Sequence, residues 1–168
     1  MPVERVPTSL AGLVGERLEA FSGRARERDL ELVVRAGDEI VELDPTRVRQ
    51  AIDNLLDNAV RHCVTGGRVT ITATAAGTVS ITVQDSGPGF SDAALAAAFQ
   101  PFNRTDNESS GAGLGLALAR AIAEAHGGRA DAWNVPAGGA TVKLTFGGGT
   151  VSRPGESVPR APVASVRS

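Results

Sequence analysis

Residues 44–63 read DPTRVRQAIDNLLDNAVRHC, and their apolar and polar side chains recur with the period of a helix. Asp44 followed by Pro45 is typical of an N-cap and the first helical position. One arc of this helix is apolar, and its members are Val48, Ile52, Leu55, Leu56, Ala59 and Cys63. The opposite arc is polar and consists of Arg47, Gln50, Asn54, Asn58 and Arg61. We therefore predict an amphipathic helix that packs its apolar arc against a core.

The polar arc has two explanations. A polar face of a helix ordinarily does no more than meet water. However, asparagine is a mediocre helix former, so Asn54 and Asn58 in mid-helix give up propensity that Glu or Lys would supply. An amide oxygen is a hard, neutral ligand suited to Mg²⁺, which keeps phosphate oxygens and water in its coordination shell. This pattern favours a phosphate-bearing ligand beside the two amides, with Arg61 one turn further on.

Residues 83–90 read VQDSGPGF and follow a predicted strand. They place Asp85 at the strand end, before Gly87 and Gly89. Glycines allow unusual backbone dihedrals and let a flat ligand approach the main chain closely. A carboxylate at such an opening can accept a hydrogen bond from an exocyclic amine such as that of adenine. The alternative is a simple turn, since DSGPG is also good turn chemistry.

Residues 111–116 read GAGLGL and lead into an apolar helical period. The glycine spacing and the polar loop before it do not fit the dinucleotide-binding fingerprint, which follows a strand directly. Glycines at a helix start nevertheless leave N–H groups open to an anion. The alternative is a flexible linker, but the immediate passage into the helix indicates a shaped helix entrance.

Local patterns assign the remaining elements. The amino-terminal half is predicted to contain a helix over 9–28, a hairpin of strands 30–35 and 39–43, and a second hairpin of strands 68–74 and 79–84. The carboxyl-terminal half is predicted to contain a short helix over 91–99, a loop over 100–113, a helix over 114–126, and paired strands 129–134 and 140–146. This order predicts an α/β fold, a two-layer sandwich in which helices cover one face of a mixed β-sheet.

The totals limit the class of protein. A chain of 168 residues with 42% hydrophobic content can close one core. Its net charge of -2 supplies no basic field, so we expect no nucleic-acid binding. Cys63 is alone and the two histidines lack metal-ligand spacing, which excludes a disulfide framework and a zinc site. With no apolar run long enough to span a bilayer, we expect a cytoplasmic protein without membrane insertion.

The order of these motifs resembles the ATP-binding catalytic domain of bacterial sensor histidine kinases. Their Bergerat fold is shared with gyrase, the Hsp90 chaperones and MutL. Four boxes match in order over about residues 10–146: the N box at 44–62, the first glycine box at 85–89, the F box FQPFNR at 99–104, and the second glycine box at 111–128. The resemblance implies an amino-terminal helix at 1–28, left from the kinase core and packed on the domain, and an ATP-binding domain at 29–146. Residues 147–168 mix Gly, Pro, Ser and Arg without periodicity, which predicts a disordered tail.

The resemblance also implies roles in binding ATP and Mg²⁺. Asn58 would be the metal ligand, Asn54 its partner, and Arg61 a phosphate ligand. His62 stands where many relatives place a tyrosine against the base, Asp85 would select adenine, and Gly87 and Gly89 would belong to the same nucleotide site.

In the relatives a mobile lid corresponds to residues 100–113. Arg104 would lie near the γ-phosphate, and Phe102 and Leu114 would belong to the nucleotide-binding residues. Three glycines would let the lid fold over the triphosphate: Gly111, Gly113 and Gly115.

Position 54 bears on the reaction. In hydrolysing relatives and anti-sigma serine kinases a Glu stands there as a base, whereas an amide cannot accept that proton. Asn54 therefore favours transfer to an imidazole. No histidine precedes His62, so we expect the acceptor histidine on a separate protein, which would pass the phosphoryl group to a response regulator, and we expect this chain alone to be monomeric.

Other possibilities remain open. The chain could be an excised domain of an ordinary kinase rather than half of a split one. The run NAVRH at 58–62 is also found in anti-sigma-factor serine/threonine kinases. A nucleotide-sensing module without turnover is a third alternative.

Overall fold

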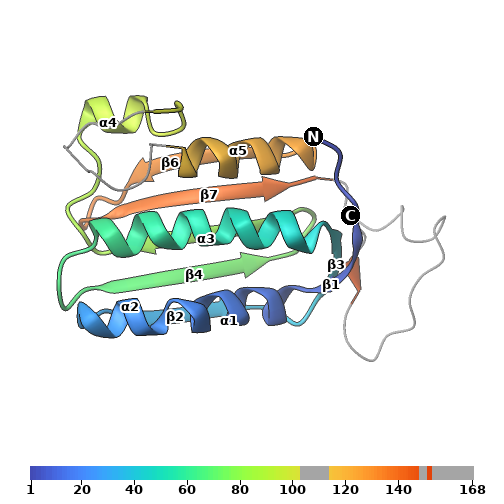
Figure 1. Cartoon of the computed structure of the whole chain (residues 1–168), viewed down its shortest axis with the longest axis horizontal. Helices are drawn as coiled ribbons and strands as arrows, with labels where there is room; N and C mark the ends of the chain where they lie inside the picture. The colour runs from blue at the N-terminus through green and yellow to red at the C-terminus, as the bar shows by residue number, and fades with distance from the viewer. Residues whose placement is uncertain (103–113, 148–150, 153–168) are drawn as a thin grey trace.

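The computed structural model describes residues 1–102, 114–147 and 151–152. The helices are α1 (Leu10–Ala20), α2 (Ser22–Glu27), α3 (Pro45–His62), α4 (Asp92–Ala96) and α5 (Gly115–Ala125). The strands are β1 (Val6–Ser9), β2 (Glu31–Ala36), β3 (Ile40–Leu43), β4 (Arg68–Thr74), β5 (Val79–Asp85), β6 (Arg129–Asn134), β7 (Ala140–Phe146) and β8 (Val151–Ser152). Helices α1, α3 and α5 lie side by side across one face of the main sheet (Figure 1).

The main sheet has five strands in the order β2-β4-β5-β7-β6. Strand β2 runs parallel to β4, whereas the other neighbours are antiparallel, so the sheet is mixed. A smaller sheet has the order β1-β3-β8. The predicted α/β sandwich with one covered face is confirmed, as are the hairpin of β4 and β5 and the closing pair of β6 and β7.

The predicted hairpin of residues 30–35 and 39–43 is wrong. Strand β2 pairs with β4, from Glu31 opposite Arg68 onward, and β3 pairs with β1, with Val6 opposite Leu43. The short turn between β2 and β3 is compatible with a hairpin, but strand partners depend on burial against the rest of the fold. Leu43 is fully buried in its own small sheet. The predicted helix over 9–28 is likewise divided into α1 and α2, and the division falls at the buried Phe21.

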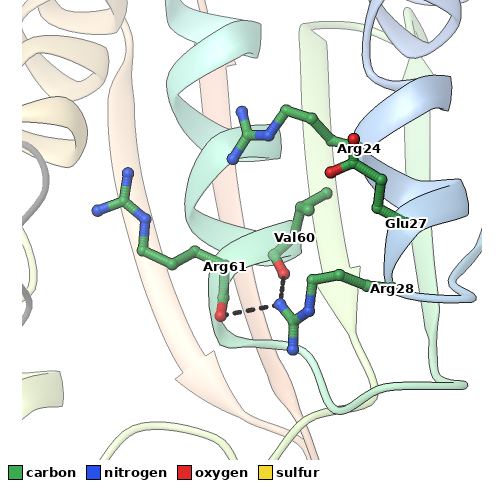
Figure 2. A pocket seen from close by; sticks show the side chains of 5 residues that line it. All are labelled: Arg24, Glu27, Arg28, Val60 and Arg61. Carbon is green, nitrogen blue, oxygen red and sulfur yellow. Dashed lines mark hydrogen bonds between the residues drawn. The ribbon is translucent and has the colours of Figure 1, made fainter.

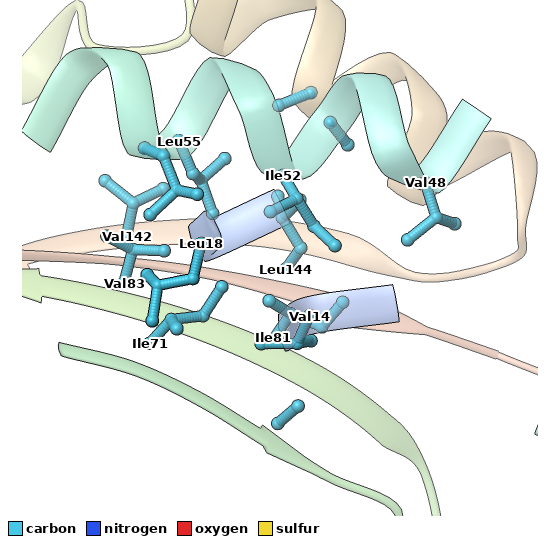
Figure 3. Packing of buried hydrophobic residues seen from close by; sticks show 14 of the residues in the cluster. Val14, Leu18, Val48, Ile52, Leu55, Ile71, Ile81, Val83, Val142 and Leu144 are labelled. Carbon is cyan, nitrogen blue, oxygen red and sulfur yellow. The ribbon is translucent and has the colours of Figure 1, made fainter. Parts of the chain in front are cut away.

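Helix α3 is the centre of the helical layer. The Asp44 side chain accepts a hydrogen bond from the Arg47 N–H at 3.2 Å, which confirms the predicted N-cap. Figure 3 shows Val48, Ile52 and Leu55 directed at the sheet. They pack over side chains of three strands, namely Ile71, Ile81, Val83, Val142 and Leu144. Because this apolar arc is buried against the sheet, the polar arc of α3 faces away from the sheet.

The amino end of α3 is joined to the carboxyl end of α5 by His126, which is fully buried. The Asp44 N–H donates to His126 Nε2 at 3.1 Å. Nε2 is therefore the accepting nitrogen, and Nδ1 carries the proton that it donates to the Ile122 carbonyl at 2.8 Å. The ring meets Phe146 edge to face, with centroids 5.2 Å apart. Burial lowers the pKa of His126, so the ring is held neutral.

The carboxyl end of α3 is held by Arg28, which follows α2. Its guanidinium donates to the carbonyls of Val60, Arg61 and Cys63. These carbonyls belong to the last turn, where helix groups lack intrahelical partners. Both ends of α3 are thus fixed by groups distant in sequence. No helix in the described part of the chain has the length and hydropathy to cross a bilayer.

Candidate functional site

Of the two predicted asparagines, Asn54 lies where α3 meets the start of α5. Asn54 and Asn58 are both half-buried. A Cβ added to Gly115 would lie 3.6 Å from Asn54 Oδ1, so the first residue of α5 packs against this amide. The N-cap residue of α5 is Leu114, and no side chain among the described residues caps this helix end. The structure therefore brings the N box and the start of the second glycine helix together.

Asn54 carries an unsatisfied polar atom. Its Nδ2 is buried and has no hydrogen-bond partner among the described residues. Leaving a buried amide group unpaired costs about 1–3 kcal/mol. Amide nitrogen and oxygen can exchange by a flip, so the same position can present either a donor or an acceptor. An unpaired amide beside an uncapped helix start fits a site that holds a polar, anionic ligand with its metal.

Asp85 ends β5 and is only 6% exposed. Its Oδ1 accepts a hydrogen bond from the Gly87 N–H at 2.8 Å. Burial raises the pKa of Asp85, against the backbone N–H groups of Gly87 and Ala140 and the charge of His62, which lower it. An ionised carboxylate has about four acceptor positions, so further donors can be accommodated.

The glycines of the 85–90 loop are required by packing within the protein. A Cβ on Gly87 would lie 2.6 Å from the His62 carbonyl oxygen, so the loop rests on the last turn of α3. Gly89 has φ +84, a left-handed conformation that favours glycine. A simple surface turn would not explain this close approach to α3. Whether the glycines also admit a nucleotide stays a prediction.

Arg61 is engaged by a neighbour that sequence reasoning did not single out. Its Nη2 donates to Asp57 Oδ2 at 2.7 Å, and Arg24 Nη2 donates to Asp57 Oδ1 at 2.8 Å. The spacing of 57 and 61, one helical turn, is the signal that could have indicated this pair. Its role toward phosphate stays a prediction.

Figure 2 shows a pocket of about 390 Å³ next to this pair, between α2 and the end of α3. Its lining residues are Arg24, Glu27, Arg28, Val60 and Arg61. Among the predicted site residues that the structure describes, Arg61 alone lines it. Its side chain extends away from the Arg28 guanidinium (Figure 2). Neither Asn54 nor Gly115 lines this pocket.

The predicted lid falls mostly outside the described residues, and so do Arg104, Gly111 and Gly113. The residues on either side are described. Phe102 is 70% exposed with φ +62, and Leu114 is 43% exposed. A positive φ is uncommon for a bulky side chain. The apolar residues at both ends of this segment therefore face solvent.

Asn134 and Gly139 also shape the site, and sequence reasoning missed both. A Cβ on Gly139 would lie 1.9 Å from the Asp85 carbonyl oxygen, so the turn between β6 and β7 packs closely against the backbone of Asp85. Asn134 ends β6 and hydrogen-bonds to Phe90. The sequence signal was weak, because asparagine and paired glycines before a strand are ordinary turn residues.

Comparisons with known proteins agree with this arrangement. A family described as histidine kinase-, DNA gyrase B- and HSP90-like ATPase matches residues 43–148. The sensor histidine kinase component HK1 of Mycobacterium tuberculosis is 43% identical over 112 residues, which are 65% of this chain and 66% of that protein. This chain thus spans just under two thirds of that relative.

Solved structures are similar over most of the chain. Full-length ShkA in complex with AMPPNP superposes with a TM-score of 0.78 at 31% identity, covering 87% of this chain and 31% of ShkA. The nucleotide-free catalytic domain of the histidine kinase ThkA superposes with a TM-score of 0.76 at 28% identity, covering 85% of this chain and 95% of that domain. The expected Bergerat fold is confirmed.

Proposed function

Because the chain belongs to the histidine kinase-, DNA gyrase B- and HSP90-like ATPase family, we propose that it binds ATP with Mg²⁺ and transfers the γ-phosphoryl group to a histidine of a separate protein. The observation that carries this proposal is the buried, unpaired amide nitrogen of Asn54 against Gly115. It is a polar position that the described protein atoms leave unsatisfied, at the helix end suited to an anion.

Two ends of the site bind different parts of the nucleotide. At the purine end, the Asp85 carboxylate accepts a hydrogen bond from the adenine amine, His62 contacts the base, and Gly87 and Gly89 let it approach the main chain. At the phosphate end, Asn58 holds Mg²⁺ with Asn54 as its partner. Bound Mg²⁺ supplies neutralisation of the charge on the triphosphate. Arg61, residues of the lid and the start of α5 complete this end. The lid residues are Phe102, Arg104, Gly111 and Gly113, and those at the start of α5 are Leu114 and Gly115.

The amide at position 54 favours an imidazole acceptor. General-base chemistry toward water or a hydroxyl needs a group that can take the proton, and an amide cannot. A neutral imidazole attacks through its own lone pair and needs no such base. Catalysis then rests on positioning and on charge stabilisation by this chain's polar and cationic side chains.

The acceptor histidine lies outside residues 1–168. This sequence holds two histidines. His126 is fully buried with both ring nitrogens in hydrogen bonds, and His62 already has the proposed role of contacting the base. The mycobacterial relative is named a component of a sensor histidine kinase, which supports an acceptor on a partner polypeptide. That partner then passes the phosphoryl group to a response regulator.

Phosphotransfer from γ-labelled ATP tests this proposal. The folded chain is incubated with Mg²⁺ and with purified histidine-containing dimerisation proteins from the same genome. Label on the partner that is lost in acid and kept in base supports a phosphohistidine. Acid-stable label would instead identify a hydroxyl acceptor, as in a serine/threonine kinase. ATP binding without label on any of these partners would identify a nucleotide-sensing module.

Two variants of α3 make the test specific. Asn58→Ala removes the proposed metal ligand, so we expect transfer to be lost while the melting temperature is kept. Gln50→Ala is the matched control, because Gln50 is exposed on the polar arc of the same helix and has no proposed role. Full transfer by Asn58→Ala would contradict the assignment of the metal ligand.

A further inference from the structure

Asn134 makes a paired contact with a backbone segment far away in sequence. Its Oδ1 accepts a hydrogen bond from the Phe90 N–H at 2.8 Å, and its Nδ2 donates to the Phe90 carbonyl oxygen at 2.8 Å. A side-chain amide can both donate and accept, so it can satisfy both polar groups of one residue. The end of β6 is thus tied to the last residue of the 85–90 loop.

The loop is shaped to accept this contact. A Cβ on Gly89 would lie 2.8 Å from Asn134 Oδ1 and 3.2 Å from the Gly139 carbonyl oxygen. Any larger residue at 89 would therefore displace the amide or the turn. Pro88 has no N–H and contributes no donor of its own. The close approach of loop and amide depends on a glycine at position 89.

The same turn also supports the other end of the loop. Gly139 has φ +101, and a Cβ there would overlap the Asp85 carbonyl oxygen at 1.9 Å. The segment from β6 to β7 therefore contacts the loop at two points. Gly139 packs against the Asp85 backbone, and Asn134 hydrogen-bonds to the Phe90 backbone. Between these two points the Asp85 carboxylate receives its hydrogen bond from Gly87. The orientation of the carboxylate depends on a loop anchored at both ends.

We propose that Asn134 is a positioning residue for the purine end of the site, acting through the Phe90 backbone to place the Asp85 carboxylate for the amine of the base. This inference rests on the proposed function, since it concerns the same nucleotide. Asn134 is itself exposed, so water can replace its two hydrogen bonds when it is removed. We therefore expect its loss to disturb the placement of the loop more than the stability of the fold.

Calorimetric titration of the full chain with ATP and with inosine triphosphate tests the inference. Inosine carries a carbonyl oxygen where adenine carries its amine, so the ratio of the two Kd values reports how well Asp85 is placed. For Asn134→Ala we expect the Kd for ATP to rise on the order of tenfold, equivalent to about 1.4 kcal/mol. We expect the Kd for inosine triphosphate to change by less than about twofold, so that the selectivity for ATP falls.

Two further variants test whether the hydrogen bonds of Asn134, and not the size of its side chain, are what matters. Asn134→Asp has the same shape and keeps the acceptor, but it loses the donor and turns a charge toward the Phe90 carbonyl. It should therefore be no better than Asn134→Ala. Asp131→Asn lies on the same strand and removes only an exposed ion pair with Arg129, so it should bind ATP as the unchanged protein does. Melting temperatures of all three should stay within a few degrees of the unchanged chain.

The outcomes are distinct. Asn134→Ala with unchanged Kd for ATP, or with both nucleotides weakened equally, overturns the inference while the proposed function stands. A large fall in melting temperature with unchanged selectivity also overturns it, because Asn134 would then be merely structural. If the unchanged chain binds neither nucleotide, the proposed function fails and the inference fails with it.

Discussion

Replacing Asp85 by Asn tests the purine end most sharply, because the amide has the shape of the carboxylate without its charge. A hydrogen bond to a charged group is worth about 1.5–3 kcal/mol. The amide keeps a neutral acceptor oxygen but loses the charge, which should raise the Kd for ATP about 10- to 100-fold. The new amide can also present its own donors to the adenine amine, which moves the effect toward the upper value. Selectivity for ATP over inosine triphosphate should disappear.

The fold should survive this change. Burial raises the pKa of Asp85, so the ionised side chain opposes folding above its ordinary pKa of 3.8. A neutral amide removes that penalty, which stabilises the fold. It also loses one acceptor for the backbone N–H groups, which destabilises the fold, so the two effects on the unfolding free energy oppose each other. We expect the melting temperature of Asp85→Asn without ligand to lie within a few degrees of that of the unchanged chain.

Thermal shift reads out both effects at once. With ATP at about 100 times its Kd, the unchanged chain should gain about 2.7 kcal/mol, or about 5–10 °C for a domain of this size. If the Kd of Asp85→Asn is raised about 100-fold, the gain falls to about 0.4 kcal/mol, or about 1 °C. A well-folded Asp85→Asn protein with the same shift and the same preference for ATP would refute the assignment of Asp85 to the base.

Three further changes probe the framework around the site. Burial holds the pKa of His126 below its ordinary value of 6.5, so the unfolded chain takes up a proton that the folded chain refuses. The unfolding free energy should therefore fall as the pH drops below about 6.5, less steeply for His126→Gln, and urea titrations over a pH series measure both slopes. Gly139→Ala should lose more than about 2 kcal/mol of unfolding free energy, through a positive φ and a methyl against Asp85. Gly138→Ala is the control, because Gly138 also has a positive φ but a Cβ there would meet no other atom. An equal loss of unfolding free energy in both variants would show that the contact with Asp85 does not contribute to stability. Arg28→Ala leaves three carbonyls at the end of α3 without its guanidinium, so denaturant unfolding should show a loss of about 1–3 kcal/mol, compared with almost none for the exposed Arg26→Ala.

Elements defined by local patterns could be predicted from the sequence. The N-cap at Asp44 and the apolar arc of α3 depend only on near neighbours, and the structure has both. The partner of β2 could not be predicted, because β2 precedes α3 in the sequence and its partner β4 follows α3. Strand β1 was missed since Pro7 and its short length hide the alternation. Long-range pairing is decided by how the whole core closes.

The candidate site divides in the same way. The motifs indicated Asn54, Asp85 and Gly87 because their chemistry and spacing can be read along the chain. Asn134 reaches Phe90 across 44 positions, and such a contact has no local pattern.

The most direct test of the proposed nucleotide site is a calorimetric titration of the folded chain with ATP, with and without millimolar Mg²⁺. We expect saturable uptake of one ATP per chain, tightened by Mg²⁺ and weakened by Asp85→Asn. No uptake of ATP by correctly folded protein at millimolar Mg²⁺ would contradict it.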